Sequence, residues 1–477
     1  MSKIPSAVVL GAGVTGQACT RVLQSRGYQV TVFDTRAISS DLASLSGVTA
    51  IVSESEEAMG QAAAATEADV YVASPGIPPH APALAPVYEQ HEVISELELA
   101  WRLQALQGGQ QPWIVVTGTN GKTTTVGLCE SVLRAAGKKA YAVGNIGISI
   151  IETVAADNYD ALVVEASSFQ LYGVKEMSPV ASVCLNVAAD HIDWHGSVKA
   201  YEAAKAKVYE NTQVACVYPV NDDKVRRMVE NADVVEGARA IGFSLDHPAI
   251  SECGVVEDMV VDRAFLDTRH TEAIAVARFA DLMGEEDALP SPTLLLDAVA
   301  AAALTRALGV SPEPVAEGFR NYQQAGHRFH SLGEVAEVTW IDDSKATNAH
   351  AAKAAIFSVP SGRAVWIAGG DTKGQTFDDL VKEVAPRLRG VIVIGEDRSQ
   401  MLQALQRHAP SVPRVEVDGH DDFMMSVVHE AVALSRPGDT VLLAPACASW
   451  DQFESYAQRG DVFAEAVERL AEQQESQ

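Results

Sequence analysis

The sequence predicts an α/β protein of three domains, in which mostly parallel strands alternate with helices. Two strand–glycine turn–helix units lie far apart in the chain, near residues 7–25 and 113–137. A third series of strands and helices begins near residue 324, and polar clusters directly follow its apolar runs. The expected domains are residues 1–98, 99–323 and 324–477.

Composition narrows the possible partners. The 477 residues include 63 acidic and 36 basic side chains, which gives a net charge of −27. Nucleic acids and anionic membranes need clustered Lys and Arg, so we expect neither as a partner. The six cysteines form no C-x-x-C pair, and neither a signal peptide nor an apolar window of about 18 residues is visible. We therefore expect a soluble cytoplasmic monomer.

The N-terminal unit carries a Rossmann-like fingerprint. A strand at 7–10 leads into Gly11-Ala-Gly-Val-Thr-Gly16, and a second strand at 29–33 ends at Asp34. Such a turn favours NAD(P), but its glycines and helix N-terminus bind any pyrophosphate. Asp34-Thr35-Arg36 is unusual for NAD, so another nucleotide-like ligand is favoured. A strand at 69–73 ends in the Ser74-Pro-Gly76 turn, at the edge where ligands bind such sheets.

The central domain contains a phosphate-binding pattern. An apolar strand at 113–116 precedes Gly118-Thr-Asn-Gly121, and Lys122 and Thr123 open a helix that ends at Gly137. Glycine turns let N–H groups approach an anion, Lys122 can reach the β/γ-phosphates, and the Thr123 hydroxyl can hold Mg²⁺. The pattern is shorter than the strict P-loop because Val116 occupies its first glycine position. The alternative interpretation is an ordinary strand–helix turn.

Acidic and histidine residues follow the next strands. Glu165 ends the apolar run 161–165, where a phosphate loop's magnesium partner usually lies, although it could also be an acid that faces water. Asp190, His191, Asp193 and His195 follow the strand at 181–185 and suggest a second cation or a substrate site. Zinc is less expected because no cysteine accompanies them. By pattern alone, Lys205 on a helix at 201–209 is a solvated lysine.

The rest of the chain contributes further polar loops. Residues 245–290 are loosely patterned, with an acidic stretch at 284–287, and an apolar helix is expected at 292–308. In the third domain, polar loops end the expected strands, as active-site loops do in open α/β sheets. The expected strands there are 338–341, 364–368, 390–394 and 440–443.

Several of these motifs, in order along nearly the whole chain, together resemble the Mur ligase family. The matching runs are Thr117–Thr124, Gly144-Asn-Ile-Gly147, Glu165-Ala-Ser-Ser-Phe-Gln170, Asn186…Asp190-His191, Tyr201…Lys205, His327-Arg328, Asp343-Ser-Lys-Ala-Thr-Asn348 and Pro445–Ser449…Asp451-Gln452-Phe453. The Gly11–Gly16 turn with Asp34-Thr35-Arg36, the S-K-A-T-N loop and the C-A-S-x-D-Q-F run resemble the family's D-glutamate-adding branch. The resemblance implies a Rossmann-like first domain, a central P-loop ATPase-type domain and a Rossmann-like third domain that binds the amino acid.

The resemblance also implies the reaction and its cofactors. ATP would phosphorylate the carboxylate of UDP-N-acetylmuramoyl-L-alanine, and D-glutamate would attack the acyl phosphate, as a step of peptidoglycan precursor synthesis. Two Mg²⁺ sites are implied, with Lys205 carbamylated. The implied metal ligands are Thr123, Glu165, His191 and Lys205. The residues implied to bind ATP are Gly118, Thr119, Asn120, Gly121, Lys122, Thr123, Thr124, Asp297, Arg328 and Asp343.

The remaining implied roles concern the two acceptor substrates. The implied catalytic residues are Lys122, His191, Lys205 and Lys345. The implied contacts of the UDP substrate are Val14, Thr15, Asp34, Thr35, Arg36, Asn145, Ser167 and Gln170. Ser74 and Gly76 are also expected to contact substrate, because their turn lies at the ligand-binding edge of the first sheet. The implied contacts of D-glutamate are Thr347, Lys373, Ser449 and Tyr456.

The chain departs from the family pattern at three points. Thr293-Leu-Leu-Leu-Asp297 replaces the H-N-x-x-N run, which leaves Asp297 as the remaining acceptor for the adenine amino group. His330 stands where Glu is common, and Tyr456 replaces a common Phe. Alternative functions are another Mur or folylpolyglutamate-type ligase, an NAD-dependent oxidoreductase, and a non-catalytic nucleotide-binding scaffold.

Overall fold

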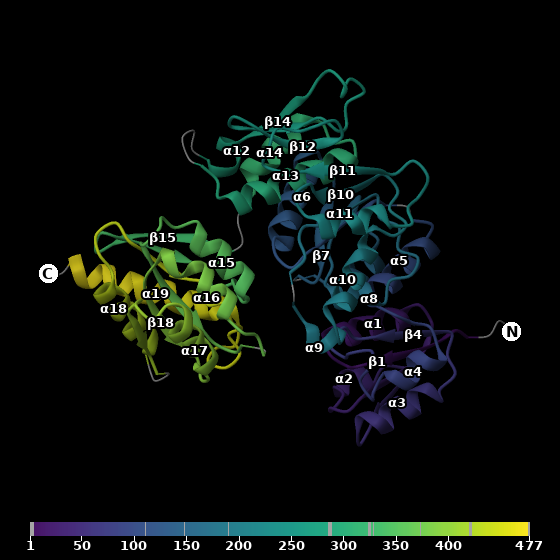
Figure 1. Ribbon diagram of the computed structural model, residues 1–477. Coiled ribbons are helices and arrows are strands. Elements are labelled where there is room, and N and C mark those ends of the chain that lie inside the picture. The colour runs from purple at the N-terminus through teal and green to yellow at the C-terminus, as the bar shows by residue number, and fades with distance from the viewer. Residues whose placement is uncertain are drawn as a thin grey trace. The chain divides into compact units, whose positions relative to one another are not determined.

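The computed structural model divides the chain into two compact units, Met1–Tyr322 and Gln323–Gln477. Figure 1 shows both units, each built of strands and helices. The structure describes residues 4–109, 111–146, 148–188, 190–284, 289–322, 326–327, 329–372, 374–418 and 422–475. Three sheets organise these residues, two in the first unit and one in the second.

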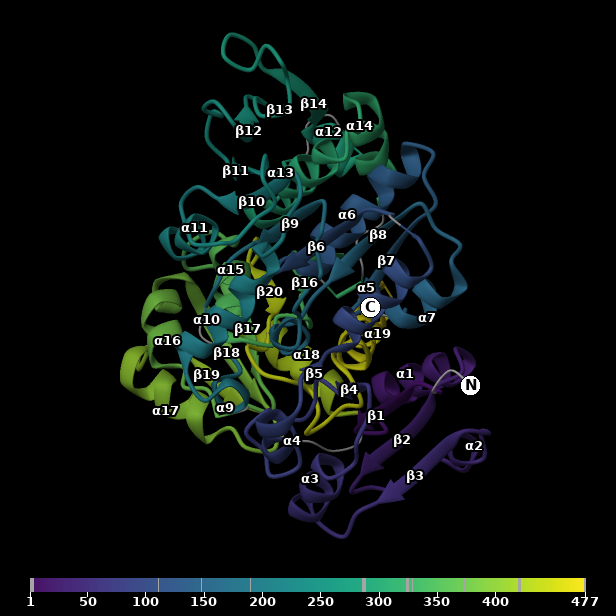
Figure 2. The same cartoon turned by 90° about the vertical axis from the view of Figure 1, so that its right-hand side faces the viewer.

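The first sheet is parallel throughout, in the order β3-β2-β1-β4-β5. Figure 2 shows its strands β1, β2 and β3 side by side. The glycine turn follows β1 and the Ser74 turn follows the neighbouring β4, so both turns lie at the same edge. The strands are β1 (Ser6–Leu10), β2 (Gln29–Asp34), β3 (Val48–Val52), β4 (Val70–Ala73) and β5 (Val93–Ile94). The helices are α1 (Val14–Ser25), α2 (Ser40–Ala43), α3 (Glu56–Ala64) and α4 (Ala85–Gln90).

The second sheet has nine strands in the order β14-β13-β12-β11-β10-β9-β6-β8-β7. It is parallel from β7 to β12, and β12, β13 and β14 pair antiparallel. Its parallel strands are β6 (Trp113–Thr117), β7 (Ala140–Gly144), β8 (Ala161–Glu165), β9 (Ala181–Cys184), β10 (Ala215–Pro219), β11 (Arg239–Phe243) and β12 (Glu252–Val256). The last two are β13 (Met259–Asp262) and β14 (Ile274–Arg278). Three short strands, β12, β13 and β14, therefore lie in the stretch 245–290 that shows no clear pattern in the sequence.

Helices cover both faces of this second sheet. The elements that pack against one face are α6 (Lys122–Ala135), α13 (Pro292–Ala307) and α14 (Pro312–Asn321). The elements of the other face are α5 (Glu96–Leu106), α7 (Ile150–Ala156), α8 (Ser168–Tyr172) and the 3₁₀ turn η1 (Lys207–Tyr209). Three further helices are α9 (Ile192–His195), α10 (Val198–Ala206) and α11 (Asp223–Glu230), and α12 (Phe279–Met283) follows β14.

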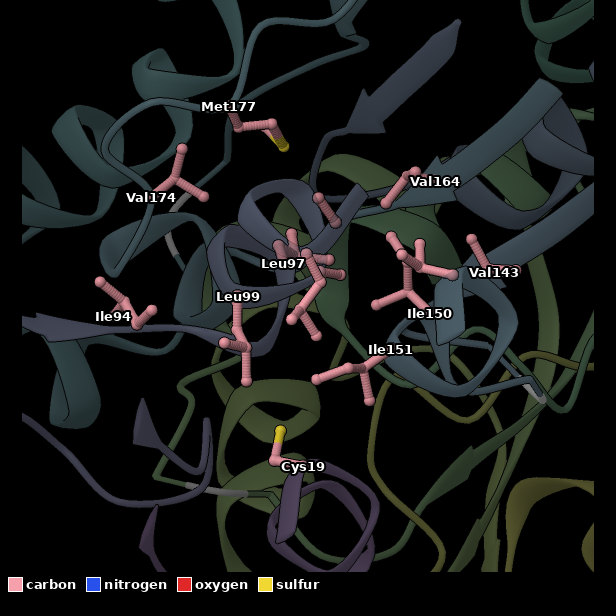
Figure 3. Packing of buried hydrophobic residues seen from close by; sticks show 14 of the residues in the cluster. Cys19, Ile94, Leu97, Leu99, Val143, Ile150, Ile151, Val164, Val174 and Met177 are labelled. Carbon is pink, nitrogen blue, oxygen red and sulfur yellow. The ribbon is translucent and has the colours of Figure 1, made fainter. Parts of the chain in front are cut away.

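One hydrophobic core joins the first two sheets. Cys19 on α1, Leu97 on α5 and Ile151 on α7 belong to the same buried cluster (Figure 3). Helix α5 runs through residue 98, the predicted end of the first domain. The Glu98 carboxylate is buried and accepts hydrogen bonds from the backbone N–H groups of residues 175–177. Because this core is continuous, the first two domains form one compact unit.

The second unit is built on a six-stranded sheet in the order β15-β16-β20-β17-β18-β19, in which only the β15–β16 pair is antiparallel. Alternation along β17 places Trp366 in the core on one face and Ile367 in the core on the other. The strands are β15 (His330–Val335), β16 (Val338–Asp342), β17 (Ala364–Gly369), β18 (Leu388–Ile394), β19 (Arg414–Glu416) and β20 (Thr440–Leu443). The helices are α15 (Ala349–Phe357), α16 (Asp378–Val384), α17 (Ser399–His408), α18 (Phe423–Leu434) and α19 (Tyr456–Glu475), with the 3₁₀ turn η2 (Ala385–Arg387) after α16.

Within the described residues, none of the helices combines the length and the apolar character needed to cross a bilayer.

Candidate active site

The phosphate loop lies between β6 and α6 and is held by the loop that follows β9. Gly121 is the N-cap of α6 and has a φ of 84°, a backbone conformation that favours glycine. The Asn186 side chain accepts from the Asn120 N–H at 2.9 Å and donates to the Asn120 carbonyl at 3.2 Å. The Thr119 N–H also donates to the Asn186 carbonyl, at 3.0 Å. Asn186 therefore fixes the shape of the loop.

The Lys122 side chain folds back over this loop. Its Nζ donates to the carbonyls of Gly118 at 2.7 Å and Thr119 at 3.0 Å. The ammonium thus lies beside the backbone N–H groups that open α6, where helix N-termini attract anions. A polyphosphate bound in this loop would meet both sources of positive charge.

A buried carboxylate meets the start of α6. Glu165 ends β8 and is 3% exposed. Its Oε2 accepts from the Thr123 hydroxyl at 2.7 Å, and its Oε1 accepts from the Asn145 amide at 3.0 Å. A carboxylate with neighbouring hydroxyl and amide oxygens is a ligand set of the kind Mg²⁺ prefers. No group of three or more His, Cys, Asp or Glu side chains that could hold a metal occurs among the described residues.

Lys205 packs against the phosphate loop, and only 2% of its surface is exposed. Its Nζ donates to the Gly118 carbonyl at 2.9 Å and the Thr117 hydroxyl at 3.3 Å. Burial, with the charge of Lys122 adding to it, lowers the pKa of Lys205 to about 7. The interpretation of Lys205 as a solvated helix lysine is therefore wrong, because α10 turns this side chain into the protein.

An aromatic cluster lies beside Lys205. We define it as Phe169, Tyr172, Trp194, His195 and Tyr201. Trp194 contacts Phe169, Tyr172 and His195, and His195 contacts Tyr201. The Tyr201 hydroxyl is hydrogen-bonded to Thr119 Oγ1 at 3.0 Å. Burial lowers the pKa of His195 to about 4, so its ring is neutral at pH 7.

His191 lies at the edge of this cluster and has a left-handed backbone, with a φ of 50°. Its ring packs edge-on against Phe169, and its Nε2 is 3.5 Å from the Asp190 carboxylate. The structure therefore brings Lys122, Glu165, His191 and Lys205 to the same edge of the second sheet, at the carboxyl ends of its strands.

The first domain presents its own ligand-binding edge. The Asp34 carboxylate accepts from the Ala12 N–H at 2.7 Å and from the Arg36 N–H at 2.8 Å. Burial alone would raise the pKa of Asp34, but these hydrogen bonds outweigh it and hold that pKa below its usual value. The Ser74 hydroxyl donates to the Gly11 carbonyl at 3.1 Å, which ties the two turns together. Val14, Thr35, Arg36 and Gly76 are exposed around this edge, with Thr15 half-buried.

The other predicted contacts of the first unit lie near the phosphate loop. Ser167 caps α8 by accepting from the Gln170 N–H, and the Gln170 side chain accepts from the Ser167 N–H. A Cβ added to Gly121 would overlap the Asp297 carboxylate of α13, so Asp297 lies directly against the loop. Thr124 is buried in the first turn of α6.

The loops after β16 and β20 contact each other in the second unit. The Arg459 guanidinium is buried and donates to the Ser344 carbonyl at 2.8 Å and hydroxyl at 2.9 Å, and to the carbonyls of Cys447 and Ala448. Ser449 is buried beside Ala448, and the Lys345 ammonium lies 4.9 Å from the Tyr456 ring centroid. Arg459 therefore holds together two loops that carry predicted site residues.

Asp343 and Thr347 lie in the first of these loops. Asp343 accepts from the Phe329 N–H, and the Thr347 N–H donates to the Lys345 carbonyl. The neighbouring His327 Nδ1 is 2.6 Å from the Asp342 carboxylate. Arg328 and Lys373 lie outside the described residues.

Sequence reasoning missed three positioning side chains. Asn186 was recognised only as part of a motif, although an Asn directly after a strand next to a glycine loop is a signal for such a clamp. The sequence places His195 among residues expected at a second cation site or a substrate site, whereas in the structure its Nε2 lies 2.9 Å from Ser168 Oγ. Nothing in the pattern around Arg459 distinguishes it from a surface arginine of an amphipathic helix.

Three family models match the chain in order. They are the Mur ligase MurD-like N-terminal domain at residues 5–95, the Mur ligase middle domain at 116–280 and the Mur ligase glutamate ligase domain at 327–447. The matched segments correspond to the three sheets of the structure.

Full-length relatives and a solved structure agree with these matches. The chain is 46% identical to the UDP-N-acetylmuramoylalanine–D-glutamate ligase of Streptomyces avermitilis and 45% identical to that of Streptomyces coelicolor, each alignment covering 97% of both chains. It also resembles the structure of MurF ligase from Thermotoga maritima in complex with ADP, with a TM-score of 0.54, 18% identity, and coverage of 86% of this chain and 96% of that one. The structural likeness supports the same fold.

Proposed function

Because this chain belongs to the Mur ligase family, among its UDP-N-acetylmuramoylalanine–D-glutamate ligases, we propose that it joins D-glutamate to UDP-N-acetylmuramoyl-L-alanine in an ATP-dependent reaction. The observation that carries this proposal is the Thr123–Glu165 hydrogen bond of 2.7 Å at the start of α6. It joins the phosphate loop to a buried acid at the carboxyl ends of two adjacent strands, where a triphosphate and a cation can meet.

Lys122 and the glycine loop would hold the ATP phosphates. A carboxylate oxygen of the UDP substrate attacks the γ-phosphorus, the bond to the β-phosphate oxygen breaks, and ADP leaves. Two anions must approach for this step, so the Lys122 charge and the N-terminus of α6 lower the barrier by neutralising them. The unprotonated amine of D-glutamate then attacks the acyl carbon, the C–O bond to phosphate breaks, and the nitrogen releases a proton as the amide forms.

Magnesium would be held by Thr123 and Glu165. Both offer oxygen ligands, and Asn145 already orients the Glu165 carboxylate. When bound, Mg²⁺ supplies further positive charge to the phosphates. A second ion would lie near His191 and Lys205.

Carbamylation of Lys205 would supply the second ion with an oxygen ligand. The neutral amine attacks the carbon of CO₂, a N–C bond forms and a proton is released. The depressed pKa of Lys205 makes the neutral amine available near pH 7. The Thr117 hydroxyl donates to the Ala166 carbonyl at 2.8 Å and accepts from Nζ at 3.3 Å, which holds the amine in place.

The first domain would bind the acceptor, and the second unit would bind the amino acid. The Gly11 turn, with Val14, Thr15, Thr35 and Arg36 around it, would bind the uridine diphosphate end. Asn145, Ser167 and Gln170 would contact the muramoyl-alanine part. Among the second unit's residues, Thr347, Ser449 and Tyr456 would bind D-glutamate, since hydroxyl groups can donate to its carboxylates. Lys345 would lie at the reacting centre.

A phosphate-release assay tests this function. We expect phosphate release only when ATP, UDP-N-acetylmuramoyl-L-alanine and D-glutamate are all present. L-Glutamate in place of D-glutamate should give little product, and Lys122→Ala should lower kcat by at least about 100-fold, as removal of a transition-state charge does. Lys199→Ala, an exposed lysine on α10, is the matched control. Equal turnover with L-glutamate, or full activity of Lys122→Ala, would contradict the proposal.

A further inference from the structure

Trp194 joins the first domain to the second. It lies on the short helix α9, whose N-cap is His191, and is 7% exposed. Its Nε1 donates to the Pro75 carbonyl at 3.1 Å, across 119 residues of sequence. Figures 1 and 2 both show α9 at the border of the first domain. Pro75 lies between Ser74 and Gly76, in the turn that follows β4.

The turn of residues 74–76, which contains Pro75, contacts the glycine loop of the first domain. Ser74 donates its hydroxyl to the Gly11 carbonyl, and its N–H donates to the Leu10 carbonyl at 2.8 Å. A Cβ on Gly11 would lie 2.8 Å from Ser74 Oγ, so the two turns are in close contact. A ligand that fixes the glycine loop would therefore also restrict the position of Pro75 in the contacting turn.

On its other side, Trp194 is linked to the phosphate loop. Its ring lies 4.5 Å from His195 and 4.7 Å from Phe169, measured between centroids. His195 contacts Tyr201 at 5.4 Å, and the Tyr201 hydroxyl is bonded to Thr119. These contacts form a continuous path of packed rings from Trp194 to Thr119 of the phosphate loop.

We propose that Trp194 is a positioning residue that couples occupancy of the UDP-substrate site to the affinity of the phosphate loop for ATP. The inference rests on the proposed function. A buried tryptophan needs an acceptor for its N–H, and here that acceptor belongs to a ligand-binding turn of another domain. Movement of that turn would therefore lengthen or shorten the hydrogen bond between the Trp194 indole and the Pro75 carbonyl.

The test uses Trp194→Phe in the full-length chain. This variant keeps an aromatic ring in the cluster but removes the donor to Pro75. We expect the KM for UDP-N-acetylmuramoyl-L-alanine to rise about three- to tenfold, as the loss of one hydrogen bond predicts. The kcat at saturation and the melting temperature should stay close to those of the unmodified chain. Trp101→Phe, in which the altered ring packs against Trp113 instead, is the matched control.

A binding experiment measures the coupling itself. The Kd of a non-hydrolysable ATP analogue is measured without and with saturating UDP-N-acetylmuramoyl-L-alanine, and the ratio gives the coupling. We expect a ratio well above one for the unmodified chain and for Trp101→Phe, and a ratio near one for Trp194→Phe. Equal ratios in all three proteins, or a ratio of one in the unmodified chain, would overturn the inference while leaving the ligase activity intact. If the unmodified chain forms no product from D-glutamate, the proposed function fails first and the inference fails with it.

Discussion

The Lys205 ammonium lies 2.9 Å from the Gly118 carbonyl, so a buried lysine is hydrogen-bonded to the backbone of the phosphate loop. Helix α10 places it there because Tyr201, one turn earlier, is buried on the same side. The arrangement puts a titratable amine, without bulk water around it, next to the proposed triphosphate site.

Lys205→Ala should lower kcat by at least about 100-fold, because the substitution removes the side chain proposed to hold the second Mg²⁺. Short carboxylates such as formate or acetate should restore part of the activity if the lysine acts as its carbamate. The matched control is Lys199→Ala, which lies on the same helix and is exposed. Failure of every small carboxylate to rescue Lys205→Ala would contradict carbamylation.

The pH dependence provides a separate check on Lys205. Its pKa of about 7 lies below the ordinary lysine value, so the neutral, CO₂-reactive form increases between pH 6 and pH 8. When the concentration of dissolved CO₂ is held equal, enzyme depleted of CO₂ should therefore regain activity faster at pH 8 than at pH 6. Mass spectrometry under non-acidic conditions should show a gain of one CO₂. Recovery that does not depend on pH would argue against an amine with this pKa.

Asn186→Ala should raise the KM for ATP about fivefold. The substitution leaves the Asn120 N–H without its acceptor, and a lost hydrogen bond in a half-buried loop is worth on the order of 1 kcal/mol. The KM for D-glutamate should not change. Asn231→Ala, an exposed residue after α11, serves as the control. An unchanged KM for ATP would show that the loop keeps its shape without the clamp.

Glu96 should make folding stability depend on pH. Burial raises its pKa, although Ser149 and the Ile151 N–H donate to its carboxylate. The folded state therefore keeps a proton that the unfolded state has lost, and stability falls as pH rises from the ordinary glutamate value through the raised one. The melting temperature of Glu96→Gln minus that of the unmodified chain should increase over this range. Glu89→Gln, an exposed control, should show no such trend, and a flat difference for Glu96→Gln would contradict the raised pKa.

Arg459→Met should destabilise the second unit by about 2–4 kcal/mol, because the buried carbonyls of Ser344 and Cys447 lose their donors. The KM for D-glutamate should rise as the two loops separate. Denaturant unfolding and steady-state kinetics measure the two effects. Arg436→Met provides a comparison at a site away from these loops. Wild-type stability and KM in Arg459→Met would show that the loops need no common anchor.

Local patterns predicted the strands that carry the site because their signals are short and strong. The apolar run ending at Glu165 and the glycine-rich turn before Lys122 were both found within a residue or two of their observed positions. The glycine turn after β1 and the Ser74 turn after β4 could be predicted to lie at the same edge, because the carboxyl ends of parallel strands meet there.

Other features could not be predicted because long-range contacts create them. The strands between Arg239 and Arg278 are short and carry no clear alternation, so their pairing across the sheet defines them. Lys205 is buried because the phosphate loop, which is distant in sequence, packs against it. The Trp194–Pro75 hydrogen bond joins two domains and leaves no signal in either segment alone.

Oxygen transfer tests the central claim that the phosphate loop delivers a phosphoryl group to a carboxylate. UDP-N-acetylmuramoyl-L-alanine is labelled with ¹⁸O in its alanine carboxylate and turned over with ATP and D-glutamate, and the released phosphate is analysed by mass spectrometry. An acyl phosphate leaves one carboxylate oxygen on phosphorus, so each phosphate should carry one ¹⁸O. Unlabelled phosphate alongside amide formation would contradict the account.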